Sequence, residues 1–389
     1  MAFEIDRDQL NFGETSGIRI KVVGIGRFGC AAVNQMVHKS ITGVDYVAMH
    51  SDPQALLDSK APLRLSIGGS PAFRGKINEE ERRHIASQLH GANVIILIAG
   101  MGKGTGTYLA PGVALVARNM GILTLGIVTT PFSCEGKAKA RSAEDGIAAL
   151  KKYVDTLVVV DNEKLLVQSA DKTTVDEAFV LTSALVLDSV KGIAEVLTSN
   201  GHINISFADF SELLANAGEA SIGMATASGE GSAQKAVMNA FKSLQIAPDA
   251  AGRINGVMVN ISGKVAMKDL TMAMNYLQER VGADANIING YIDHSPEPGV
   301  TRAMLIVTGV RQAPKGASPQ PPENKPQGWP ISLPGITNKG IKPPAYLQQQ
   351  MRIEGQQGSL SPQSSSFACG DRINKSSPGT PAFERLITE

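Results

Sequence analysis

Two glycine-rich turns limit most strongly what this chain can fold into. Each turn follows an apolar run rich in β-branched residues and precedes a helical stretch: IRIKVVGIG (18–26) leads into the first turn and ANVIILIAG (92–100) into the second. Glycine allows the backbone to turn sharply and to approach an anion closely. We therefore expect an α/β domain with the architecture of a nucleotide-binding protein.

The first half of the chain alternates between apolar runs of strand length and helical stretches. The runs at 44–50, 92–98, 121–129 and 155–160 are predicted to be strands, and 79–89 and 108–119 to be helices. Strands that alternate with helices at this spacing favour a doubly wound parallel sheet, with ligands at the carboxyl ends of the strands. The predicted fold class of this half is therefore α/β.

The second half begins with a long apolar stretch over 174–199, which predicts a buried helix connecting two domains. After the loop NGHINISFADF we expect helices near 232–243 and at 267–281, and strands at 256–261, 286–292 and 303–308. Their order suggests a smaller α+β domain, with its own sheet packed on helices.

Composition changes sharply near the C-terminus. Twelve of the twenty prolines lie between residues 313 and 389, among Gln, Ser and Gly, which is typical of a disordered linker. The predicted organisation is an N-terminal tail (1–17), a nucleotide-binding domain (18–173), a connecting helix (174–199), a second domain (200–312), a linker (313–375) and a docking peptide (376–389).

Overall charge and cysteine usage exclude several classes of protein. The 37 Lys and Arg residues nearly cancel the 36 Asp and Glu residues, so no general attraction to nucleic acid is expected. The three cysteines are far apart, which argues against disulfides and zinc and favours a reducing cytoplasm. No run reaches the roughly 18 apolar residues of a membrane span, so we expect a soluble protein without direct membrane insertion.

The two glycine turns allow different readings. Residues 24–29 fit G-x-G-x-x-G, with Asp52 about twenty residues later, as in nicotinamide dinucleotide sites. In residues 100–107 glycines alternate with other residues, two of them threonines, before a predicted helix N-terminus, which suits a bound phosphate better. The alternative for either turn is that its glycines serve only the close packing of a helix on the sheet.

Several motifs carry a family resemblance. AGMGKGTGT (99–107) resembles the tubulin signature in its FtsZ form, and SDPQALL, GILTLGIVTTPFSCEGK, VDTLVVVDNEKLL, KGIAEVLTSNGHINISFADF and VNISG accompany it in family order. The resemblance covers roughly residues 18 to 312. On these motifs the chain is identified as a divergent FtsZ-like member of the tubulin/FtsZ family, whose members act in cell division.

The resemblance implies a GTP-binding domain with GTP or GDP as its ligand, and Mg²⁺ held mainly by the phosphates. It assigns nucleotide binding to the first loop, the signature loop and side chains beyond them, and hydrolysis to a loop in the second domain. The implied nucleotide-binding residues are Gly26, Gly29, Gly100, Met101, Gly102, Lys103, Gly104, Thr105, Gly106, Thr107, Glu135, Lys139, Asn162, Phe179 and Ser183, and the implied catalytic residues are Asn204, Ser206 and Asp209.

Departures from the family pattern surround the expected phosphates. Arg27, Phe28, Cys30 and Ala31 replace glycines and an asparagine, and their bulk should push the nucleotide outward or close the pocket. Lys103 replaces a glycine of the signature loop, where an ammonium group either contacts a phosphate or points to solvent.

The hydrolysis loop also departs from the family. Ser206 stands where the family has the first of two acids, and a serine cannot supply a negative charge to orient water. The remaining acid, Asp209, is either catalytic or the N-cap of a following helix. Hydrolysis is therefore expected to be slow.

The resemblance also implies partners and a place in the cell. It implies a head-to-tail homopolymer with a hydrolysis site shared between two subunits, at the division septum. The C-terminal TPAFERL resembles the family peptide that binds membrane-tethering adaptors. Two alternatives stay open: a structural filament partner without nucleotide binding or hydrolysis, and, more remotely, a nicotinamide-dependent oxidoreductase.

Overall fold

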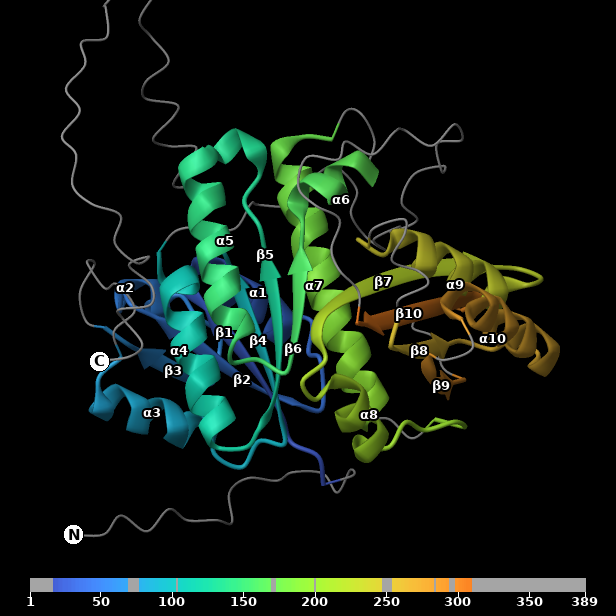
Figure 1. Ribbon diagram of the computed structural model, residues 1–389, viewed down its shortest axis with the longest axis horizontal. Coiled ribbons are helices and arrows are strands. Elements are labelled where there is room, and N and C mark those ends of the chain that lie inside the picture. The colour runs from blue at the N-terminus through green and yellow to red at the C-terminus, as the bar shows by residue number, and fades with distance from the viewer. Residues whose placement is uncertain are drawn as a thin grey trace, which may run out of the picture. The chain divides into compact units, whose positions relative to one another are not determined.

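The first half of the chain forms the expected parallel sheet (Figure 1). The computed structural model describes residues 17–68, 77–102, 104–168, 173–198, 201–246, 254–282, 285–293 and 298–309. Six strands lie in the order β3-β2-β1-β4-β5-β6, and neighbouring strands pair in parallel. They are β1 (Ile20–Ile25), β2 (Val44–His50), β3 (Leu63–Ser66), β4 (Val94–Gly100), β5 (Leu123–Thr129) and β6 (Thr156–Val160).

Helices cover both faces of this parallel sheet. The side chains of β4 alternate between two hydrophobic clusters, with Ile96 and Ile98 in one and Ile95 and Leu97 in the other. The helices of this half are α1 (Gly26–His38), α2 (Gln54–Leu57), α3 (Glu79–Leu89), α4 (Thr105–Asn119), α5 (Lys137–Lys151) and α6 (Asn162–Gln168), with a short 3-10 turn, η2 (Ser133–Glu135). A central strand buried on both faces explains why its sequence is uniformly apolar.

The long helix α7 (Val175–Thr198) confirms the predicted connection. Most of its faces are buried, and its internal hydroxyls have acceptors. Ser189 donates to the carbonyl oxygen four residues earlier, and the single Thr182 proton is shared between the Ala178 carbonyl and the Asn162 Oδ1. Near its C-terminal end the carboxylate of Glu195 forms an ion pair with Arg302 of a strand in the second half. The helix therefore packs as part of the core and contacts both halves.

The second half of the chain extends the same sheet instead of forming a separate one. Its strands are β7 (Gly218–Ser228), β8 (Gly256–Ser262), β9 (Asn286–Ile292) and β10 (Val300–Thr308), in the order β7-β10-β8-β9. The start of β7 pairs in parallel with β6, and its remainder pairs antiparallel with β10. The expectation of a second, smaller sheet was wrong, because β7 is long enough to pair with both halves.

Three further helices complete the second half. They are α8 (Phe207–Leu214), α9 (Ser232–Ser243) and α10 (Met267–Val281). The sequence predicted α9 and α10, whereas the helices α2, α5, α6 and α8 and the strands β3 and β7 were missed. The predicted tail (1–17, apart from Gly17), linker (313–375) and docking peptide (376–389) lie outside the described residues.

Two glycines allow close packing with different neighbours. A side chain at Gly223 of β7 would collide with the backbone carbonyl of Ala240 in α9, which cannot move without separating strand and helix. A side chain at Gly192 of α7 would meet the sulfur of Met304, which sits at the end of a flexible side chain. The first contact should be much more costly to disturb.

We therefore predict that Gly223→Ala lowers the free energy of unfolding by about 1–3 kcal/mol, the usual cost of overpacking. Gly192→Ala should cost little, since the methionine can rotate and alanine favours a helix by about 1 kcal/mol over glycine. Urea denaturation of both variants measures the difference. Equal losses would show that the backbone contact at Gly223 is not the limiting one.

Candidate functional site

Two helix N-termini meet at one edge of the sheet. β1 and β4 are neighbouring parallel strands, and α1 and α4 begin where these two strands end. Neither helix has a side-chain hydrogen bond at its N-cap. The first amide groups of a helix have no partner within it and carry partial positive charge. This edge of the sheet therefore favours an anion.

Glycines bring the two helix starts into contact. A Cβ atom at Gly26 would lie 2.8 Å from the Gly106 nitrogen, and one at Gly106 would lie 2.6 Å from the Gly100 oxygen. A Cβ atom at Gly29 would collide with the carbonyl oxygen of Ile98. Gly104 differs, because it has a φ of 81° and open space around its missing side chain. Close packing thus requires Gly26, Gly29 and Gly106, whereas Gly104 faces open space.

The signature loop closes on itself through Thr107. This residue is fully buried, and its Oγ1 accepts the Gly102 N–H at 3.0 Å. The neighbouring Met101 N–H donates to the Thr129 carbonyl at 2.9 Å. Only Thr105 of the two threonines reaches a neighbouring loop, where its hydroxyl lies 2.5 Å from that of Ser51. Lys103, the remaining residue of interest in this loop, lies outside the described residues.

The end of β2 adds a buried histidine to the same edge. The Nδ1 atom of His50 accepts the Asp52 N–H at 2.9 Å, which leaves the proton of a neutral ring on Nε2. Burial lowers the pKa of His50; the charge of Asp52 opposes this shift, and the nearby Arg27 adds to it. At neutral pH this site therefore contains an uncharged imidazole, which the sequence did not identify as a site residue.

Two of the bulky replacements in the first loop turn toward the core. The Cys30 side chain is buried against the carbonyl oxygens of Gly24 and Met49, and burial raises its pKa to about 12. Phe28 packs against the core cluster on the same face of the sheet. Arg27, in contrast, is exposed. The side chain of Cys30 thus lies in the interior, whereas Phe28 is half-buried and lies beside Gly100 of the signature loop, so the expectation that bulk here displaces the nucleotide stays a prediction.

A second group of predicted residues surrounds Phe132. Glu135 accepts the Phe132 N–H at 2.9 Å and pairs with Lys139 at 3.0 Å. The rings of Phe132 and Phe179 meet edge to face, with centroids 5.0 Å apart. The structure therefore brings predicted residues of η2, α5 and α7 together around an aromatic residue that the sequence did not single out.

Two more predicted residues are buried beside this group. Asn162 is 3% exposed, and its Oδ1 accepts the Thr182 hydroxyl of α7 at 3.0 Å. Ser183, the next residue of α7, is also buried. Because Thr182 occupies the carbonyl oxygen of Asn162, the amide NH₂ of Asn162 is left as the donor for a ligand.

The predicted hydrolysis loop lies at the other end of α7. Figure 1 shows α6 near one end of this helix and α8 at the other. The helix has 24 residues and is therefore about 36 Å long. Asn204, Ser206 and Asp209 are exposed and are not brought together with the glycine loops within this subunit.

Ser206 has a structural role that the sequence did not reveal. Its hydroxyl accepts the Asp209 N–H at 3.1 Å and donates to the Asp209 carboxylate at 2.7 Å, which makes Ser206 the N-cap of α8. The alternative reading of Asp209 as the N-cap was therefore wrong. Asp209 lies in the first turn of α8 with one carboxylate oxygen already hydrogen-bonded.

The described residues contain no cluster of three or more His, Cys, Asp or Glu that would hold a metal ion. None of their helices is both long and apolar enough to cross a lipid bilayer.

Comparison with known proteins agrees with this geometry. Residues 19–169 match the model of the GTPase domain of the Tubulin/FtsZ family, and residues 218–311 match the C-terminal domain of the FtsZ family. A mutant FtsZ from M. jannaschii is 30% identical, with a TM-score of 0.70, over 75% of this chain and 91% of that one. The chain belongs to the tubulin/FtsZ family.

Two other solved structures are similar in fold. An empty FtsZ dimer from M. jannaschii is 29% identical with a TM-score of 0.69, over 75% of this chain and 88% of that one. CetZ2 from Haloferax volcanii, in a GTPγS-bound protofilament, is 18% identical with a TM-score of 0.64, over 76% and 94% of the two chains.

The tubulin/FtsZ fold explains why the chain has two glycine turns. The nicotinamide-dependent alternative depended on the first turn and on Asp52. In the structure the Asp52 carboxylate accepts the Gln54 N–H at 3.0 Å in a local turn. That alternative is therefore no longer needed.

Thr107 offers a test of how the signature loop is closed. Thr107→Val has nearly the same shape but leaves the buried Gly102 N–H without an acceptor, which should cost about 1–3 kcal/mol of unfolding free energy. Thr107→Ser keeps the hydroxyl and should lose much less. Urea denaturation separates the two variants, and an equal loss in both would mean that the methyl group of Thr107 matters more than its hydroxyl.

Proposed function

We propose that this FtsZ-family chain binds GTP and GDP and assembles head to tail into filaments that hydrolyse GTP slowly. The observation that carries the proposal is the meeting of two uncapped helix N-termini, α1 and α4, through the contact of Gly26 with Gly106. A phosphate chain placed there would receive amide donors from both helices. The names of similar structures, which include a GTPγS-bound protofilament, support the choice of ligand.

In this proposal the phosphates occupy the space in front of Gly104. Amide groups at the start of α1 and α4 donate to them, Thr105 supplies a hydroxyl, and Thr107 maintains the shape of the loop. Since the described part of the chain offers no metal cluster, a Mg²⁺ ion would be held mainly by the phosphates. The proposed phosphate-site residues are Gly26, Gly29, Gly100, Met101, Gly102, Lys103, Gly104, Thr105, Gly106 and Thr107.

The ribose and base then extend toward the residues around Phe132. The carboxylate of Glu135, oriented by Lys139, suits the hydroxyls of a ribose. Phe179 provides an aromatic face for the base, and the amide NH₂ of Asn162 suits a base carbonyl. Ser183 is proposed to contact the base from α7.

Hydrolysis in this proposal requires two subunits. Asn204, Ser206 and Asp209 follow the C-terminal end of α7, whereas Phe179 lies near its N-terminal end, roughly 28 Å away along the helix. In this proposal the three residues therefore act on the nucleotide of a neighbour. Ser206 caps α8 and carries no charge, which leaves Asp209 as the single acid. Loss of one preorganised group of this kind typically reduces rates by about 10² to 10³.

A second candidate function follows from the same serine. A chain that binds nucleotide but hydrolyses it very weakly would serve as a structural partner in filaments of a more active relative. The absence of a second acid at position 206 favours this reading for catalysis, while the intact helix N-termini favour nucleotide binding.

The cellular role is proposed from the FtsZ resemblance. We propose that the protein acts in the cytoplasm at the division septum and that residues 376–389 bind a membrane-tethering adaptor. These residues lie outside the described part of the chain. Deleting them should leave assembly intact and abolish recruitment to adaptor-coated vesicles; loss of assembly would place the segment within the filament instead.

Gly104 provides a direct test of nucleotide binding. Gly104→Ala forces a side chain into a backbone conformation that costs about 1–3 kcal/mol and should weaken GTP binding at least tenfold. Gly121→Ala is the matched control, because Gly121 also has a positive φ of 69° and open space but lies at the other end of α4. Equilibrium dialysis measures both. A wild type that binds no GTP or GDP at millimolar concentration contradicts the proposal.

Ser206 tests the catalytic part of the proposal. Ser206→Asp keeps a residue suited to capping and restores a second acid, so phosphate release per subunit in the filament should rise at least tenfold. Ser206→Ala removes the cap, costs about 1 kcal/mol of stability and should not raise the rate. Asp209→Ala should abolish release and leave GTP binding unchanged.

The dependence of phosphate release on protein concentration separates a shared site from a site within one subunit. The rate per subunit should rise from near zero as the protein begins to assemble. A rate per subunit that is independent of concentration excludes the shared site.

A further inference from the structure

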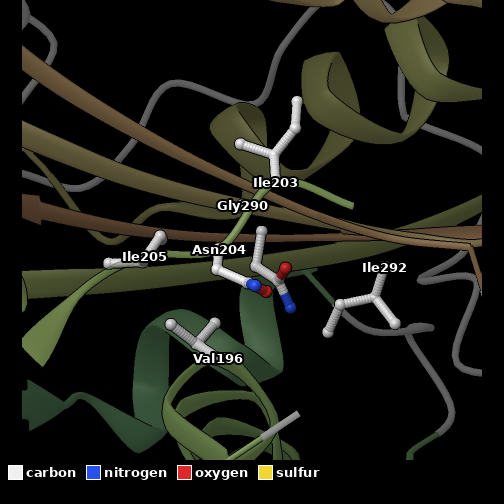
Figure 2. Close-up of a pocket in the computed structure, with 7 residues that line it drawn as sticks. Val196, Ile203, Asn204, Ile205, Gly290 and Ile292 are labelled. Carbon is white, nitrogen blue, oxygen red and sulfur yellow. The ribbon is translucent and has the colours of Figure 1, made fainter. Parts of the chain in front are cut away.

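A small pocket lies beneath the segment 201–206, between this segment, α7, β8 and β9. Aliphatic side chains line most of it, including Val196, Ile205 and Ile292 (Figure 2). Two amides interrupt this apolar lining: Asn204 from the segment itself and Asn260 from β8. A polar pair in such surroundings requires an explanation.

The amide oxygen of Asn260 lacks a partner. Asn260 is 2% exposed, and its Oδ1 is the one buried side-chain nitrogen or oxygen atom without a hydrogen bond in the described part of the chain. Gly290 of β9 is close, since a Cβ atom there would lie 3.2 Å from this oxygen, but it brings no side-chain donor. Burying an unpaired amide oxygen is costly, so such an atom is expected to have a role.

Asn204 has the complementary donor. Its Oδ1 accepts the Gly201 N–H at 2.7 Å, which fixes the carbonyl side of the amide within the segment. Its NH₂ group carries two donor protons, and no bond from this group is seen among the described residues. In Figure 2 the Asn204 side chain points from the segment into the pocket.

The backbone of the segment is already attached to β9. His202 and Ile203 donate to the Tyr291 carbonyl at 3.0 and 3.3 Å, and Tyr291 donates back to Ile203 at 2.9 Å. Ile205 is buried beneath the segment. These bonds hold the segment against β9, where Asn204 and Asn260 line the same pocket.

We propose that Asn260 is a positioning residue, whose buried oxygen accepts a hydrogen bond from the Asn204 NH₂ group and so orients the segment 201–206. Asn204 keeps its bond to Gly201 and links the segment to β8. The inference rests on the proposed function in one respect: this segment is the one that would complete a neighbour's hydrolysis site. Asn260 itself touches no nucleotide.

Two nearly isosteric substitutions test this bond: one removes its donor and the other removes its acceptor. Asn204→Asp keeps the acceptor for the Gly201 N–H but loses both donor protons. Asn260→Leu replaces the buried amide by an apolar side chain of similar size. If Asn260→Leu does not fold, Asn260→Ala removes the same oxygen and takes its place in the comparison.

The test is hydrogen exchange of the His202 and Ile203 amides in the full-length protein, measured in the wild type, both single variants and the double variant. Each single variant should exchange about tenfold faster, and the double variant should exchange no faster than the single variants. The urea midpoint of Asn260→Leu should stay near that of the wild type, because the lost hydrogen bond orders the segment 201–206 and the leucine fills the buried space of the amide. Unchanged exchange in the single variants, or effects that multiply in the double variant, overturns the proposal.

Phosphate release from the same variants separates this inference from the proposed function. Asn260→Leu should reduce release in the filament at least tenfold and leave GTP binding unchanged. If the effects of the two substitutions on exchange are not multiplied in the double variant, but the wild type hydrolyses no GTP, the role of Asn260 is supported and the proposed hydrolysis is rejected. If phosphate release depends on assembly, but the two substitutions change amide exchange independently of each other, the positioning role of Asn260 is rejected and the proposed function stays intact.

Discussion

The contact between the first turns of α1 and α4 is the constraint on which the rest of this structure depends. β1 and β4 are paired so that Ile25 lies opposite Ala99, and both helices therefore start at the same level of the sheet. Gly26 and Gly106 then allow the two helix starts to touch, which no other residue type would permit. The positive ends of two helices at one point form an anion site from backbone alone, and it tolerates replacements such as Cys30 whose side chains turn inward.

The helix α7 separates the proposed base-binding residues from the proposed hydrolysis residues. Its N-terminal part places Phe179 against Phe132, and its C-terminal end leads into the segment that carries Asn204 and Asp209. Burial on most faces and the ion pair between Glu195 and Arg302 hold the helix against both halves of the sheet. The two groups therefore lie at opposite ends of one rigid helix, which is the arrangement that the proposed shared site requires.

The sequence predicted the parts of the fold that depend on burial and periodicity. The uniformly apolar strand β4 and the helix α7 were recognised because their burial requires an apolar sequence. β7 was missed because its small residues, GEASIGMATAS, lack the β-branched character of a strand; the close approach of α9 to Gly223 explains that composition. Strand pairing across β6 and β7 depends on tertiary contacts that no local pattern records.

The residues of the candidate site were predicted by their place in the family motifs, and the structure adds contacts that the motifs do not record. Thr107 closes its loop from inside and Ser206 caps α8. Ser51 and Phe132 lie within recognised motifs but were not singled out, and Thr182 joins the site without any motif to mark it. The unpaired oxygen of Asn260 arises from the packing of β8 against the segment 201–206 and has no signature in the sequence.

The most direct test of the account is a comparison of affinities for guanosine, GMP, GDP and GTP by isothermal titration calorimetry. If the helix N-termini of α1 and α4 hold the phosphates, affinity should rise at least a hundredfold between GMP and GDP, since charge-assisted bonds from several amides form only with the longer phosphate chain. Equal affinities for guanosine and GTP would contradict the account, because they would mean that these two helix starts bind no phosphate.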